Sequence, residues 1–147
     1  MADLRALFDD LVRFETMLWS AIDERLQADC GLTLSNLNVM LVIDGTGDCR
    51  VLDIADALAI TVGGTSQAVD RLEKAGWSRR RAHPTDRRSS IVELTPEGLA
   101  TLRSAEPVFE DELERLIADP LAEAGVVSMA DSLGILRRSI VRVRPPN

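Results

Sequence analysis

Residues 54–94 carry the pattern that most constrains the fold: two short helical segments followed by a β-hairpin. The first segment starts near Ile54, and the second runs from Thr61 to just before Gly76, a residue type that often ends helices. Core-type side chains recur at helical spacing along one face of the second segment: Thr65, Val69 and Leu72. Two short helices joined by a tight turn predict a helix-turn-helix, whose second helix lies in the major groove in DNA-binding proteins.

Two strand-like runs follow, residues 77–82 and 90–94, and a basic loop joins them into a predicted wing. The whole chain is acidic, with 24 Asp and Glu against 17 Lys and Arg, which argues against indiscriminate coating of nucleic acid. The window 71–88 nevertheless holds seven of those basic residues and two acids, so it carries +5 while the remainder carries −12. A basic footprint on an acidic body indicates docking of one face onto phosphates. A solvated basic hairpin is the alternative.

Three motifs in this region resemble the MarR family of winged-helix transcriptional regulators. They are Asp70-Arg71-Leu72-Glu73-x-x-Gly76-Trp77, Asp86-Arg87-Arg88 and Leu94-Thr95-Pro96-Glu97-Gly98, in the family's order and spacing. The resemblance extends over essentially the whole chain. It implies a homodimer formed by interlocking terminal helices, and a small aromatic or phenolic effector bound between those helices and the DNA-binding lobe. It also implies that the protein acts chiefly as a repressor.

The remaining chain predicts a mostly α fold with a small β-hairpin wing, in the order α-α-α-α-β-β-α-α. We expect a single domain over 1–147, with a DNA-binding lobe at 33–95 and dimerisation helices at 3–30 and 96–143. Apolar residues in the first helix exceed what one core face needs, which indicates burial against a second chain. Pro120 predicts a break, with a further helix from about Val126.

The DNA-facing residues follow from helical phase and from charge. On the second helix of the motif they are Val62, Gly63, Gly64, Ser66, Gln67 and Arg71. Ser66 and Gln67 suit base edges, whereas Arg71 suits phosphate. The glycine pair departs from many relatives and costs about 0.5–1 kcal/mol of helix stability per residue. A close approach of the helix start to a phosphate would offset this cost; otherwise the site simply tolerates the pair.

In the wing, Arg88 suits insertion into a narrow minor groove, and Asp86 is expected to hold its guanidinium by a forked pair. The same Asp-x-Arg arrangement is implied by the family resemblance. The expected phosphate contacts are Arg80, Arg81 and Arg87. Residues expected near a ligand cleft, although a plain core role also explains them, are Met17, Trp19, Met40 and Leu41.

An enzyme is not predicted. With one histidine, His83, and two cysteines, the sequence offers no metal-ligand set, no catalytic triad and no phosphate-binding glycine loop, and it implies no cofactor. It has no apolar run of 18 residues and no leader, so we expect no membrane span and a cytoplasmic protein.

Two alternatives to a ligand-responsive regulator stay open. One is a winged-helix module that binds protein. The other is a redox-responsive regulator that uses Cys49, whose neighbour Arg50 favours a thiolate although Asp48 offsets it. Cys30 is less suited, because it lies at a helix C-terminus beside Asp29. The preferred function is sequence-specific transcriptional regulation by a homodimer on a pseudo-palindromic operator.

Overall fold

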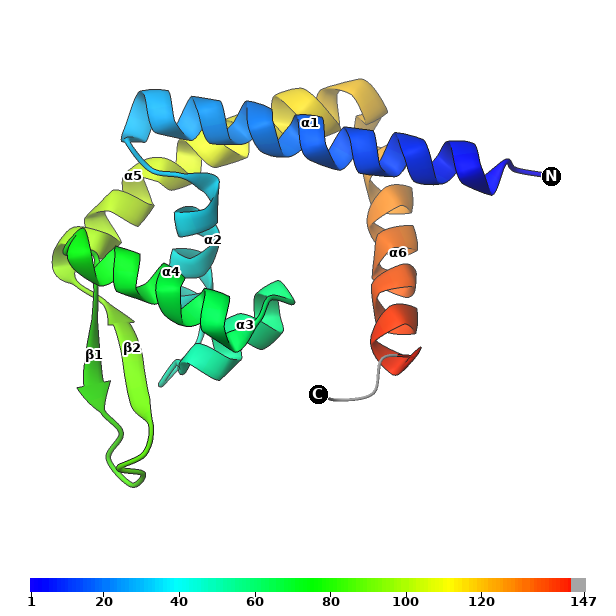
Figure 1. Cartoon of the computed structure of the whole chain (residues 1–147). Helices are drawn as coiled ribbons and strands as arrows, with labels where there is room; N and C mark the ends of the chain where they lie inside the picture. The colour runs from blue at the N-terminus through cyan, green and yellow to red at the C-terminus, as the bar shows by residue number, and fades with distance from the viewer. Residues whose placement is uncertain (144–147) are drawn as a thin grey trace. The chain divides into compact units, whose positions relative to one another are not determined.

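The computed structural model describes residues 1–143 and confirms a mostly helical chain with one antiparallel hairpin (Figure 1). Its elements, in chain order, are α1 (Leu4–Cys30), α2 (Leu34–Gly45), α3 (Val51–Leu58), α4 (Val62–Lys74), β1 (Ser78–Ala82), β2 (Ser90–Leu94), α5 (Pro96–Leu113), a π-helical turn (Glu114–Ala118) and α6 (Asp119–Val143). The predicted order of helices and strands is therefore confirmed. The chain divides into an N-terminal unit, Met1–Phe109, and a C-terminal unit, Glu110–Asn147.

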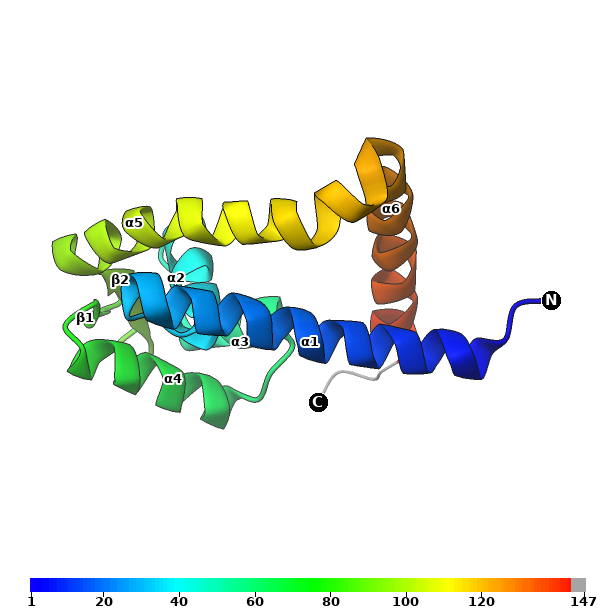
Figure 2. The same ribbon diagram turned by 90° about the horizontal axis from the view of Figure 1, so that it is seen from above.

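Helix α2 organises the core of the N-terminal unit. It contacts α1, α3, α4 and strand β2, and Figures 1 and 2 show it in the midst of these elements. Seven of its twelve residues have large apolar side chains, and Leu37 and Met40 are fully buried. Each of these neighbours also contributes a fully or almost fully buried side chain: Leu26, Ile54, Leu72 and Val92. Each such side chain stabilises the fold by about 1.5–3 kcal/mol through burial.

Capping interactions fix both ends of α1 and the start of α2. Asp3 caps α1 by accepting hydrogen bonds from the backbone N–H groups of Arg5 and Ala6. Gly31 ends α1 with φ of 63°, as predicted for a C-terminal glycine. The Leu34 N–H then donates to the Asp23 carboxylate at 2.7 Å, which ties the start of α2 back onto α1.

Gly76 ends helix α4 as the sequence predicted. Its φ is 78°, its N–H donates to the Glu73 carbonyl, and the Trp77 N–H donates to the Leu72 carbonyl. This pair of hydrogen bonds is a Schellman motif, which satisfies carbonyls that a helix end otherwise leaves free. Strand β1 begins directly after this turn.

The Thr95–Gly98 motif at the start of α5 packs against that same turn. The Thr95 hydroxyl donates to the Gly76 carbonyl at 2.6 Å and accepts the Gly98 N–H at 3.0 Å. The Thr95 N–H donates to the Trp77 carbonyl at 3.0 Å. Two of the three motifs noted in the sequence therefore meet in space, and they join the end of α4 to the start of α5.

The break predicted at Pro120 lies two residues later, at Ala122. Helical backbone runs without interruption from α5 through the π-helical turn to Pro120. It departs from helical geometry at Ala122, with φ of 54° and ψ of 169°, and the helix then continues to Val143.

Within residues 1–143, no single helix is both long and apolar enough to cross a membrane. Helices α1 and α2 reach the necessary length and composition only as a pair, and they meet at a bend of 82°. Buried Leu37 and Met40 place α2 in the core of the N-terminal unit.

Candidate nucleic-acid interface

Helix α4 presents a polar and glycine-rich face to solvent, in the phase that the sequence predicted. Thr61 caps the helix by accepting the Gly64 N–H at 3.1 Å. Four side chains face the core: Thr65, Ala68, Val69 and Leu72. The predicted DNA-facing residues are exposed or, for Ser66, half-buried: Val62, Gly63, Gly64, Ser66, Gln67 and Arg71. Hydrogen-bonding groups of Ser66 and Gln67 are therefore available at the surface.

The two glycines at the start of α4 are not equivalent. A Cβ atom at Gly63 would meet nothing within 4 Å, so nothing in this chain requires glycine there. A Cβ atom at Gly64 would lie 3.1 Å from the Thr61 hydroxyl, which is the atom that caps the helix. A side chain at position 64 would crowd the Thr61 cap, so glycine is favoured there. Glycine at position 63 leaves the N-terminus of α4, the positive end of the helix dipole, open to solvent.

The wing is a short antiparallel ladder that is buried on its inner side. Arg80 pairs with Val92 and Arg81 with Ile91 in the register, and Ile91 and Val92 are both buried. At the tip, the His83 N–H donates to the Ser89 carbonyl at 3.3 Å and closes the loop. The wing thus rests on the core through β2, and its tip carries the polar residues.

Asp86 acts differently from the sequence prediction. Its Oδ1 accepts the backbone N–H of Arg88 at 3.0 Å, and its Oδ2 lies 4.0 Å from the guanidinium of Arg50. The predicted forked pair with the Arg88 guanidinium is not formed. A carboxylate at this spacing closes a local turn by binding the backbone two residues ahead, which leaves the Arg88 side chain exposed.

Arg80 is tied to the recognition helix. Its guanidinium lies 2.8 Å from the Asp70 carboxylate and also bonds Glu73, while its backbone N–H donates to Glu73 at 3.1 Å. The Arg80 side chain is only 27% exposed. This arginine therefore joins strand β1 to α4, and the predicted phosphate contact would require it to leave two carboxylates.

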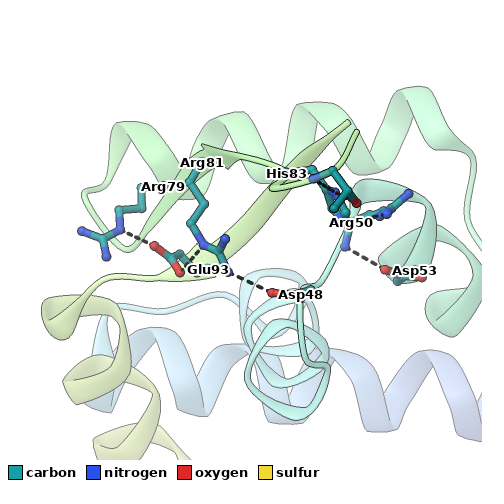
Figure 3. Close-up of polar contacts among 8 residues, drawn as sticks. Asp48, Arg50, Asp53, Arg79, Arg81, His83 and Glu93 are labelled. Carbon is teal, nitrogen blue, oxygen red and sulfur yellow. Dashed lines mark hydrogen bonds and ion pairs between the residues drawn. The ribbon is translucent and has the colours of Figure 1, made fainter. Parts of the chain in front are cut away.

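Arg81 is also paired within the chain. It donates to Glu93 at 3.1 Å and to Asp48 at 2.9 Å, and Arg79 donates to Glu93 at 2.7 Å (Figure 3). The two arginines hold the pKa of the Glu93 carboxyl below its usual range, so Glu93 stays ionised. Arg81 thus crosslinks the two strands and reaches the loop before α3.

Four basic residues of the 71–88 window form no ion pair within the described part of the chain: Arg71, Lys74, Arg87 and Arg88. Arg71 and Lys74 lie in the last turn of α4, and Arg87 and Arg88 lie at the wing tip. All four are exposed. The positive charge that is free to meet phosphate is therefore divided between the recognition helix and the wing tip.

The candidate ligand cleft does not assemble from the residues that the sequence suggested. Met40 is fully buried in the core, Leu41 is half-buried, and Met17 is 71% exposed on α1. Trp19 lines a shallow surface hollow with Glu15, Thr16 and Ser20. A separate cavity of about 210 Å³ lies at the base of the wing and is lined partly by Asp48, Arg81 and Glu93.

Both cysteines have environments that disfavour a thiolate. Cys49 is buried, and burial followed by the nearby Asp53 carboxylate raises its pKa to about 11. Arg50 does not offset this shift, because its guanidinium points to His83. Burial, then Asp29, raises the pKa of Cys30 too, while Arg25 lowers it. These environments argue against the redox alternative based on Cys49.

We expect thiol reagents to distinguish the two cysteines. In the native protein, Cys49 should react at least about tenfold more slowly than half-buried Cys30, because its raised pKa leaves little thiolate until the pH approaches 11. Reaction with a chromogenic disulfide would measure both rates, and Cys30→Ser should remove the faster phase. Two equally fast thiols near neutral pH would contradict the assignment and restore the redox alternative.

The contact between the start of α3 and the wing was not predicted from the sequence. Arg50, the residue before α3, lies with Nη2 2.8 Å from Nε2 of His83 in the wing. The two residues are 33 positions apart, and no periodic or compositional signal connects them. The only hint was that Arg50 stands where a helix start usually has Ser, Thr, Asp or Asn.

Comparisons with known proteins agree with this geometry. The MarR family model matches residues 31–89. The transcriptional regulator PecS of Dickeya dadantii is 37% identical over 92 residues, which cover 62% of this chain and 54% of PecS. YfiV, an uncharacterised regulator of Bacillus subtilis, is 27% identical over 74% of this chain and 68% of its own.

A solved structure extends the likeness to the full length. Sco3205, a MarR family transcriptional regulator of Streptomyces coelicolor solved in complex with DNA, superposes with a TM-score of 0.85 at 28% identity, covering 100% of this chain and 91% of that one. The match therefore includes the terminal helices as well as the winged-helix lobe. By its motifs, its fold and these relatives, this chain is similar to the winged-helix transcriptional regulators of the MarR family, whose model matches residues 31–89.

Proposed function

We propose that this protein is a sequence-specific transcriptional repressor that binds a pseudo-palindromic operator as a homodimer. The observation that carries the proposal is the free basic and polar surface of α4 and the wing, with Gln67 and Arg71 on the helix and Arg88 at the wing tip. In a winged helix, the recognition helix reads the major groove. Arg88 then enters the adjacent minor groove, and Arg87 contacts phosphate.

The dimer is supported by apolar surface that the single chain leaves open. On α1 the exposed apolar side chains include Leu4, Leu7, Phe8, Leu11 and Val12. On α6 they include Val127, Ile135, Leu136, Ile140 and Val141. Apolar surface of this extent on two terminal helices is typical of an interface between subunits.

Regulation follows from the dimer. A small-molecule effector changes the separation of the two recognition helices and thereby lowers operator affinity. This step rests on the family, as does repression, and neither requires catalysis. We place the protein in the cytoplasm, where its operator is.

Deletion of the gene should raise expression from the cognate promoter. A fall in that expression would favour activation.

The wing offers the sharpest test of operator binding. With DNA flanking the protein's own gene as probe, Arg88→Ala should weaken binding by about 1–3 kcal/mol and reduce the salt dependence by nearly one ion. Asp86→Ala should weaken it by about 1 kcal/mol, because the turn that presents Arg88 loses its acceptor. Asp86→Asn should bind nearly as well as wild type, because its side-chain oxygen still accepts the Arg88 N–H. Fluorescence anisotropy at two salt concentrations measures all three.

A purely electrostatic role for Asp86 predicts a different order of DNA affinities among these variants. If Asp86 acted only as a negative charge near phosphate, Asp86→Ala and Asp86→Asn would both tighten binding equally. That result would remove the turn-closing role. Failure of the wild-type protein to shift flanking or random DNA, even at low salt, would instead favour the protein-interaction alternative and remove the proposed function.

A further inference from the structure

The short segment Asp48–Cys49–Arg50, which we call the brace, contacts the wing at three points, and Figure 3 shows the side chains at two of them. At the base, the Val92 N–H donates to the Cys49 carbonyl at 2.7 Å. Higher on the wing, Arg81 reaches Asp48 at 2.9 Å. At the tip, the Arg50 guanidinium meets His83 at 2.8 Å. The wing is therefore attached to the start of α3 along its length.

Arg50 makes the outermost of these contacts. Its backbone N–H donates to the Asp53 carboxylate at 2.7 Å, which fixes the start of α3 without using the Arg50 side chain. Its guanidinium is left to contact the wing tip, with Nη2 on His83 and Nη1 4.0 Å from the Asp86 carboxylate. Arg50 thus spans from the helix-turn-helix to the turn that presents Arg87 and Arg88.

The His83 ring faces two competing sets of donors. On one side is the Arg50 guanidinium, which can only donate, and on the other the backbone N–H groups of Thr85 and Asp86 lie 3.2 and 3.1 Å from Nδ1. A neutral imidazole has one acceptor nitrogen, so it can satisfy only one side at a time. The bond to Arg50 is shorter and charge-assisted, which favours Nε2 as the acceptor. Nδ1–H can then donate to the Thr85 hydroxyl at 3.3 Å.

We propose that Arg50 is a positioning residue of the DNA-binding surface: by holding His83 and facing Asp86, it fixes the wing tip relative to the helix-turn-helix. The inference rests on the proposed function for its consequence, since a fixed tip matters because Arg88 must enter the groove beside the one that α4 reads. Arg50 acts through His83 and not by a phosphate contact of its own. The contributions of Arg50 and His83 to DNA binding should therefore depend on each other.

The first test needs no DNA. Because the chain contains one histidine, ¹⁵N-histidine labelling of protein without an affinity tag gives a single imidazole whose tautomer NMR reads directly. At mildly alkaline pH, where free imidazole is neutral, wild type should show the Nδ1–H form. Arg50→Met should switch the ring to the Nε2–H form, because the Thr85 and Asp86 N–H groups then become its donors. Arg50→Lys, which retains a donor, should keep a substantial share of the wild-type form.

Arg79→Met is the matched control. Arg79 lies on wing strand β1 and has the same charge as Arg50, but it pairs with Glu93. It should leave the tautomer unchanged. An unchanged tautomer in Arg50→Met, or an equal change in Arg79→Met, would overturn the assignment of Arg50.

The second test measures operator affinity in a double-mutant cycle. Arg50→Met should weaken binding about tenfold in the wild-type background and His83→Ala by a similar factor, each as the loss of one charge-assisted hydrogen bond. The double variant should bind no worse than either single variant. If Arg50 contacted phosphate independently, the losses would multiply to about a hundredfold, and the positioning role would be wrong.

The two tests separate this inference from the proposed function. A tautomer switch in a wild-type protein that binds no DNA would keep the Arg50–His83 link and remove both the operator function and the role of Arg50 in it. The opposite outcome is that the wild type binds its operator normally, the two substitutions lower affinity independently, and the tautomer does not switch. That outcome would leave the proposed function intact and overturn the inference.

Discussion

Replacing Gly98 with alanine is expected to lower the free energy of unfolding by about 3 kcal/mol, at the upper end of the usual cost of overpacking. A Cβ atom at this position would lie 1.9 Å from the Trp77 carbonyl oxygen and 2.7 Å from its carbon. These are backbone atoms held by the Schellman turn and by the Thr95 N–H, so they cannot rotate aside as a flexible side chain could. The start of α5 must therefore move away from the end of α4.

Gly63→Ala is the matched control for this substitution. It adds the same methyl group to a helical glycine, but into open space, so we expect a gain of about 0.5–1 kcal/mol from the better helix propensity of alanine. Urea unfolding of the three proteins, followed by circular dichroism, gives both differences. A Gly98→Ala variant as stable as wild type would show that the two helices are not held together at this point.

The sequence was sufficient for features that depend on neighbours in the chain. The phase of α4, its start at Thr61 and its end at Gly76 follow from residue types within one or two helical turns, and the structure has them where they were predicted. The MarR resemblance also located the Thr95–Gly98 motif. Its physical reason, the close approach of Gly98 to the Trp77 backbone, became visible only in three dimensions.

Partners of charged side chains could not be predicted in the same way. Arg80 faces Asp70 and Glu73 from across the turn, and Arg50 meets His83 from 33 residues away. A count of charge along the sequence treats all seven basic residues of the 71–88 window as equally free to bind phosphate. In the fold some of them are paired within the chain and others are not, because a guanidinium bonds whichever carboxylate or ring the backbone brings near.

The role of Asp86 was misread for a related reason. A carboxylate can bind a guanidinium or close a turn, and the choice depends on backbone geometry that one sequence does not specify. In this chain Asp86 closes the turn before Arg88. The break near Pro120 was predicted to within two residues, because a kink lies at Ala122.

The dimer should be the most sensitive determinant of operator affinity. Phe8 is 67% exposed on α1, so Phe8→Glu removes little from the fold of the single chain. In a two-fold dimer it would bury an unpaired carboxylate twice, and we expect the variant to be monomeric at micromolar concentration. A monomer reads one half-site instead of two, and loss of this bivalency should weaken binding to the full operator by at least about a hundredfold.

A half-site duplex makes the reason for that loss measurable. The recognition helix and wing are far along the chain from Phe8, so Phe8→Glu should bind a single half-site as well as one wild-type subunit does. Ala6→Glu is the control, because it adds the same charge to an exposed position on the polar face of α1, beside Asp9 and Arg13 at helical spacing. It should remain a dimer and bind two half-sites about 10 bp apart with wild-type affinity. A wild-type protein that sediments as a monomer, or a Phe8→Glu dimer with unchanged affinity, would show that the exposed stripe on α1 serves another purpose.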